Sequence, residues 1–76
     1  MQMERQDLPA LVKEARRQLS LSQEGLAREL GVSFATVNRW ENGQAKPSKL
    51  ARAQLDAFCE RMQAAGMLDL AENGHG

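Results

Sequence analysis

The residues that most restrict the possible folds of this chain are 22–43, which read SQEGLARELGVSFATVNRWENG. Ser22 and Ser33 are good N-cap residues, and Gly31 supplies the left-handed conformation that ends a helix. The small side chain of Ala27 suits a close crossing between two helices. The segment therefore predicts two short helices joined by a tight turn, with one face of the second helix held outward.

The chain has 76 residues with one cysteine and one histidine, so neither a disulfide framework nor a cysteine- and histidine-bound zinc site supports its core. No apolar run reaches the roughly 20 residues that cross a bilayer, and no signal-peptide pattern opens the chain. We therefore expect a single cytoplasmic domain over residues 1–76, with no cofactor, no metal and no membrane contact.

The spacing of apolar residues and the capping signals predict an all-α fold, a compact four- to five-helix bundle that contains a helix-turn-helix. The expected helices cover about residues 8–19, 23–30, 33–42 and 48–65, followed by a short C-terminal turn and tail over 66–76. The apolar stripe expected on the last helix comprises Leu50, Leu55, Phe58, Cys59 and Met62. Gly25 costs about 0.5–1 kcal/mol relative to alanine inside a helix, which implies either close packing there or a soft helix.

The third helix is expected to have an inner and an outer face. At 100° per residue, Val37 and Trp40 fall on one arc, which predicts that both pack into the core. Ala35, Asn38 and Arg39 fall on the opposite arc and are left outward. A methyl group, an amide and a guanidinium suit the edges of DNA bases, so this face is predicted to enter the major groove.

The formal net charge is zero, but the charges are unevenly distributed. Residues 33–52 carry four basic groups and one acidic group, 4 − 1 = +3, whereas residues 53–76 carry one basic and four acidic groups, 1 − 4 = −3. Lys46 and Lys49 flank the start of the last helix, whose positive dipole end favours a phosphate. Arg16 and Arg17 are weaker phosphate candidates on a first helix whose basic face is expected to be solvated.

Residues 22–48 also resemble a known family. The pattern Ser-Gln-x-x-Leu-Ala-x-x-Leu-Gly-Val-Ser-x-x-Thr-Val-x-x-Trp-Glu-Asn-Gly, followed by Lys-x-Pro-Ser, is similar to the helix-turn-helix of the phage repressor and Cro-like (XRE) family. The resemblance implies a lambda-repressor-like fold and double-stranded DNA as the partner. The base-reading positions that it implies are Phe34, Ala35, Asn38 and Arg39. The candidates for contact with the DNA backbone are Gln23, Ser33, Gly43, Lys46 and Lys49.

Three classes of function remain open at this point. The first is a sequence-specific DNA-binding transcription regulator, with a homodimer through the last helix and the C-terminal segment. The second is a DNA-tethering or antitoxin-like subunit of a toxin–antitoxin or restriction–modification system. The third is a protein-interaction module without DNA binding, which the zero net charge and Phe34 favour, because polar residues are commoner than phenylalanine at that position of the family. An enzyme is not expected, since no acid, base and nucleophile converge.

Overall fold

The structure, a computed structural model, describes residues 7–70. This part of the chain forms four helices and no strand, so the predicted all-α fold is confirmed. The helices are α1 (Leu8–Leu19), α2 (Gln23–Leu30), α3 (Phe34–Glu41) and α4 (Lys49–Ala64). The first two coincide with the expected ranges, and the last two are one residue shorter at each end. None of the helices in residues 7–70 is long and apolar enough to cross a membrane.

Each helix begins at a capping side chain. The side-chain oxygens of Asp7, Ser22, Ser33 and Ser48 accept hydrogen bonds of 2.8–3.1 Å from the backbone N–H groups three residues further on. These bonds satisfy donors that a helix cannot pair internally. The start of each of the four helices is therefore determined by residues close to it in the sequence.

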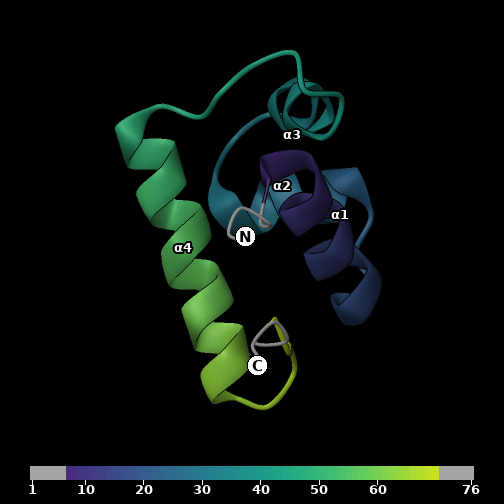
Figure 1. Ribbon diagram of the computed structural model, residues 1–76, viewed down its shortest axis with the longest axis vertical. Helices are drawn as coiled ribbons and strands as arrows, with labels where there is room; N and C mark the ends of the chain where they lie inside the picture. Colours follow the sequence, from purple (N-terminus) through teal and green to yellow (C-terminus); the bar gives the residue numbers. More distant parts are fainter. Residues whose placement is uncertain (1–6, 71–76) are drawn as a thin grey trace.

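The helices pack around one core. Helices α1, α2 and α3 form a group in which α3 contacts both others, and α4 lies alongside against α2 (Figure 1). The largest fully buried side chains are Trp40, Leu26, Leu55, Val12 and Val37. The inner arc predicted for the third helix thus forms part of the core, which leaves its opposite face pointing away from the molecule.

One apolar prediction for α4 is wrong. Leu50 is 73% exposed, whereas Leu55, Phe58 and Cys59 are buried. Five residues advance a helix by roughly 500°, so Leu50 points about 140° away from Leu55. Ala51, which is better aligned with Leu55, is the half-buried residue of the first turn.

The C-terminal segment returns to α1 without forming a fifth helix within the described residues. After Gly66, Leu68 is buried, and the Gln18 side chain clamps the backbone of Asp69. The Gln18 amide donates to the Asp69 carbonyl at 2.9 Å and accepts from the Asp69 N–H at 2.7 Å. The tail expected after residue 70 lies outside the described residues.

Candidate nucleic-acid interface

A tight turn sets the direction of α3. Gly31 ends α2 with φ +75°, and Ser33, two residues later, is the N-cap of α3. The Ser33 hydroxyl accepts from the Thr36 N–H and forms a 2.9 Å bond with the Thr36 hydroxyl. Ala27 is buried, and α2 packs against α3. The turn and the capping bonds leave α3 little freedom to rotate relative to α2.

Three polar side chains fix α3 against the other two helices. Arg16 of α1 donates from Nε to Glu41 Oε2 at 2.5 Å and from Nη2 to Glu41 Oε1 at 2.9 Å. Gln23 of α2 donates from Nε2 to Glu41 Oε1 at 3.0 Å. Glu41 is the last residue of α3 and its side chain is only 4% exposed, so this Arg16–Glu41–Gln23 network joins the three helices at one carboxylate.

Burial and hydrogen bonding act in opposite directions on this carboxylate. Burial alone raises the pKa of Glu41 by penalising its charged form. The hydrogen bonds from Arg16 and Gln23, together with the charges of Arg16 and Lys13, outweigh that penalty and hold the pKa below its ordinary value. Glu41 is therefore ionised at neutral pH, and the network is charged.

The outer face of α3, defined by Phe34, Ala35, Asn38 and Arg39, is available to a partner. Phe34 is 50% exposed, Ala35 and Arg39 are exposed, and Asn38 is half-buried. Neither Asn38 nor Arg39 makes a side-chain hydrogen bond or ion pair with residues 7–70. The C-terminal residues that the structure describes lie against α1 instead, so they do not cover this face.

Comparison with known families agrees with this geometry. The model of a helix-turn-helix family matches residues 12–51, which are 40 of the 76 residues. The chain belongs to the Cro/C1-type helix-turn-helix family. It is therefore a DNA-binding helix-turn-helix domain. Comparison with curated proteins and with solved structures gives no significant match.

In this Cro/C1-type domain, the candidates for phosphate contact lie where α3 leads into α4. Lys46 and Lys49 are exposed, and neither forms an ion pair within residues 7–70. An open hollow of about 350 Å³ between the two helices is lined by Arg39, Lys46 and Ser48, among others. No acidic residue occupies the first turn of α4. The surface therefore combines unpaired cations with the positive end of a helix that has no acidic residue in its first turn.

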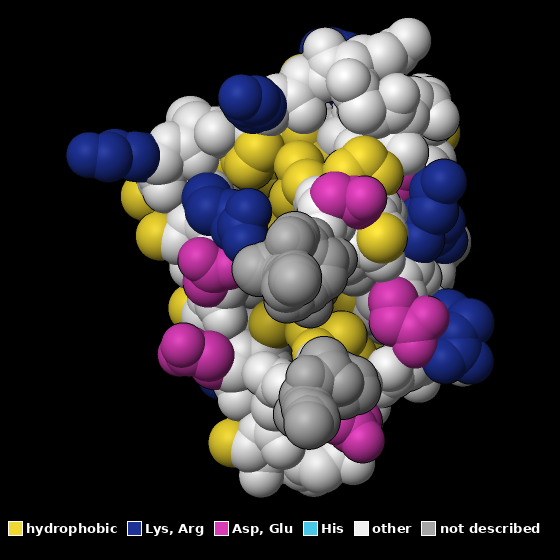
Figure 2. Space-filling model, viewed as in Figure 1, with side chains coloured by type: hydrophobic (Ala, Val, Ile, Leu, Met, Phe, Trp, Pro, Cys, Tyr) yellow, Lys and Arg dark blue, Asp and Glu magenta, His cyan; other side chains and the backbone are white. Residues whose placement is uncertain are grey.

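Along α4, the charges on one visible face follow the order read from the sequence. On the face in Figure 2, Lys and Arg side chains gather over the first turns of α4 and the preceding loop, and acidic side chains follow further along α4. Arg52 pairs with Asp56 at 3.0 Å, so it contributes less free charge than Lys46 and Lys49.

The other candidates for contact with the DNA backbone are more constrained by their surroundings than the two lysines. Gly43 has φ +71° in the loop after α3, a conformation that favours glycine. Ser33 is exposed, but its hydroxyl is engaged in capping. Gln23 is half-buried, and one of its amide N–H groups is bonded to Glu41, which leaves the second for a partner.

The expectation that Arg16 lies on a solvated face is wrong. Its side chain is 25% exposed and points into the junction of three helices, while Arg17 pairs with Glu14 at 2.6 Å on the surface. Sequence reasoning missed this network because its partners lie 25 and 18 residues apart. The available signal was Glu41 itself, a charged residue beside the inner arc of α3. Within residues 7–70, no group of His, Cys, Asp or Glu is arranged to hold a metal ion.

Proposed function

We propose that this domain is a sequence-specific transcription regulator that places α3 in the major groove of DNA. In this arrangement Arg39 and Asn38 hydrogen-bond to base edges, while Phe34 and Ala35 contact apolar groups in the groove. The observation that carries the proposal is the outer face of α3, exposed and free of internal partners while the opposite face is locked into the core. A face held this firmly can discriminate base pairs, because it cannot readjust to accommodate a wrong one.

The same arrangement assigns the DNA backbone to the residues around the outer face. Lys46 and Lys49 neutralise phosphates next to the start of α4, and Gly43 brings the backbone of the preceding loop close to the duplex. Gln23 offers its second amide N–H, and Ser33 lies at the start of α3. These contacts fix the register of the domain on the duplex but carry no sequence information.

The decisive experiment selects bound sites from a random duplex library and then measures Arg39→Ala on the selected site and on all its single base-pair variants. We expect a loss of about 1–3 kcal/mol in binding free energy, concentrated at one base pair. Arg61→Ala is the matched control, because Arg61 lies near the other end of α4, over the Phe58 ring. A loss spread evenly over all sequences would make Arg39 a backbone contact. A library that yields no enriched site would refute the proposal.

We further propose that two copies associate through α4 and the C-terminal segment. Met67 is 59% exposed beside an open hollow of about 210 Å³, whose lining includes Leu19, Leu21 and Met62. The domain measures 33 × 27 × 21 Å, so neighbouring copies can place their α3 helices about one DNA turn, roughly 34 Å, apart. Sedimentation with and without DNA tests this association. Met67→Lys is expected to weaken the association without unfolding the domain. If the unchanged domain and Met67→Lys both sediment on DNA with the mass of one copy, the association is excluded.

We also propose that the domain acts by binding alone. Glu41, its most buried carboxylate, is already bonded to Arg16 and Gln23, and Cys59 is a buried thiol whose pKa is raised by burial and by nearby Asp56. Neither group is free to act as a general base or nucleophile.

A further inference from the structure

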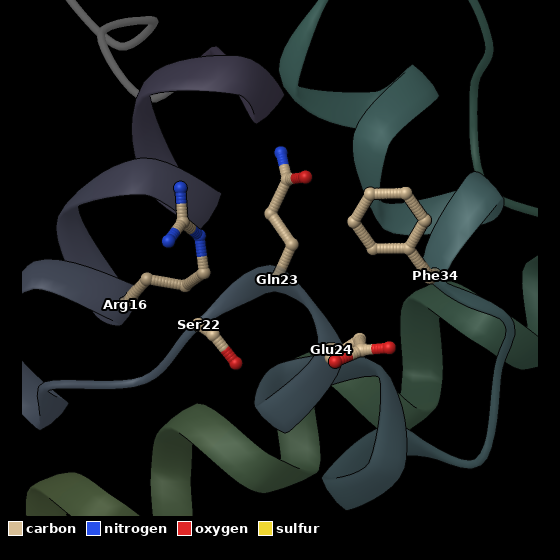
Figure 3. Close-up of a pocket in the computed structure, with 5 residues that line it drawn as sticks. All are labelled: Arg16, Ser22, Gln23, Glu24 and Phe34. Atoms are coloured by element: carbon tan, nitrogen blue, oxygen red, sulfur yellow. The ribbon is translucent and has the colours of Figure 1, made fainter.

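An open hollow lies between the first turns of α2 and α3, and an apolar ring forms part of its lining. It measures about 480 Å³ and is lined by Arg16, Ser22, Gln23, Glu24 and Phe34. Figure 3 shows Gln23 and Phe34 projecting into the same opening from the two helices, and Glu24 also lines it. Phe34 is the first residue of α3 and is 50% exposed, so its ring is not part of the core.

The charged groups of this α2–α3 hollow do not suit a phosphate. The charge of Arg16 is already paired, because its guanidinium donates to Glu41 through Nε and Nη2, and it also donates to the Leu21 carbonyl at 3.1 Å through Nη1. Glu24 is exposed and has no ion pair within residues 7–70. Arg16, Glu41 and Glu24 together carry +1 − 1 − 1 = −1. A phosphate inside the hollow would meet an uncompensated carboxylate and no free cation, so the backbone contact proposed for Gln23 is confined to the rim of the hollow.

What the hollow does offer is the exposed ring of Phe34 in the same lining as the Glu24 carboxylate and the Gln23 amide, whose oxygen atoms accept hydrogen bonds. In the major groove, the complementary base-pair edge carries a pyrimidine 5-methyl group next to an exocyclic amine. Thymine paired with adenine presents both groups across the pair, and 5-methylcytosine presents both on one base. Cytosine and uracil lack the methyl group, so they leave the ring without an apolar partner.

We propose that Phe34 determines specificity by contacting the 5-methyl group of one pyrimidine in each half-site. This inference rests on the proposed placement of α3 in the major groove and adds to it the chemical group that is read. Thymine and 5-methylcytosine are the two sources of that group. Burying one methyl group against the ring corresponds to about a fourfold gain in affinity.

The test replaces each thymine of the selected site by uracil, one at a time, because this exchange removes only the methyl group. We expect one position per half-site at which the affinity falls about three- to fivefold, with changes below about twofold elsewhere. At that position cytosine binds more weakly still, and 5-methylcytosine recovers about the same factor relative to cytosine. Equal binding of cytosine and 5-methylcytosine would restrict the source of the methyl group to thymine.

Variants of Phe34 separate the ring from the rest of the interface. Phe34→Ala removes the difference between thymine and uracil, and Phe34→Leu, which remains apolar, retains part of it. Leu50→Ala also removes an exposed apolar side chain, but from the first turn of α4 rather than from α3, so it leaves the difference unchanged. Because Phe34 is half exposed, both variants are expected to fold, which circular dichroism verifies.

Two outcomes overturn the inference, and they differ in what they say of the proposed function. One outcome is that a specific site is selected but no uracil substitution changes the affinity, or that Phe34→Ala keeps the full difference in affinity between thymine and uracil. In that case Phe34 does not recognise a methyl group, and the proposed binding in the major groove stands. If no site is selected from the library, both the inference and the proposed function fail.

Discussion

Replacing Arg16 by methionine tests whether the Arg16–Glu41–Gln23 network holds α3 in place. The substitution removes two hydrogen bonds to a carboxylate whose side chain is 4% exposed, and leaves it with Gln23 alone. Breaking a buried ion pair in this way costs about 3–5 kcal/mol. Because the Arg16 side chain is itself 25% exposed, we expect a loss at the low end, about 3 kcal/mol in the free energy of unfolding.

Denaturant unfolding and thermal unfolding measure this loss. In a domain of this size about 3 kcal/mol lowers the midpoint temperature by roughly 12–24 °C. Arg17→Met is the matched control, because Arg17 makes the same kind of ion pair with Glu14 on the surface, where the two side chains are 71% and 40% exposed. Exposed pairs contribute about 0–1 kcal/mol, so Arg17→Met is expected to have little effect. Equal losses for the two variants would refute a structural role for the network.

The stability deficit of Arg16→Met is expected to depend on pH. In the natural chain the pKa of Glu41 is lowered from the ordinary 4.5, so its contribution to stability is full above pH 4.5 and is lost as the pH falls through the lowered value. Without Arg16, burial is expected to prevail and to raise the pKa of Glu41. Protonation then favours the folded state, so the deficit of Arg16→Met narrows as the pH falls from 7 toward 4.5. A constant deficit over that range would show that Glu41 does not titrate as argued.

Three further predictions concern single residues. Ser20 ends α1 with φ 56°, so Ser20→Gly is expected to stabilise the domain by about 1 kcal/mol in thermal unfolding, and an unchanged midpoint would show that the left-handed conformation is not strained. Gly31 has φ +75° and no atom within 4 Å of the place that a β-carbon would take, so Gly31→Ala is expected to cost about 1–2 kcal/mol through backbone strain alone, and a neutral result would contradict that cause. Lys46→Gln and Lys49→Gln are each expected to reduce the slope of log affinity against log salt by about 1, whereas Arg61→Gln leaves it unchanged.

Much of the fold follows from short-range features of the sequence. The starts of α2, α3 and α4 follow from serines whose side chains bond the backbone three residues on, and the burial of Trp40 follows from its angle to Val37. The burial assigned to Leu50 failed because membership of an apolar stripe depends on angle, and Leu50 lies off that angle. The left-handed cap at Ser20 was missed because glycine is the usual signal for that conformation.

Features that depend on distant partners could not be obtained this way. No helical periodicity of α1 reveals that Arg16 meets Glu41, because the pair forms only after α3 has packed on α1.

The reason for a glycine at position 25 also could not be decided from the sequence. A β-carbon there would lie 3.2 Å from the Ser22 hydroxyl and 3.3 Å from the Leu21 side chain, so the glycine is explained by close packing. The roles assigned to Asn38 and Arg39 remain predictions that binding experiments test.

The zero net charge of this chain does not argue against a nucleic-acid partner, because its acidic groups are not distributed evenly among its basic ones. Glu41 is buried against Arg16, so it subtracts little from the field outside the domain. Arg39, Lys46 and Lys49 have no acidic partner within residues 7–70 and lie around the junction of α3 and α4. Their attraction acts over about a Debye length, roughly 8 Å at physiological salt, so it strengthens a docked complex more than it steers distant encounters. We therefore expect weak binding to random duplexes and a specificity that depends on base contacts. An affinity for random DNA equal to that for the selected site would contradict this reasoning.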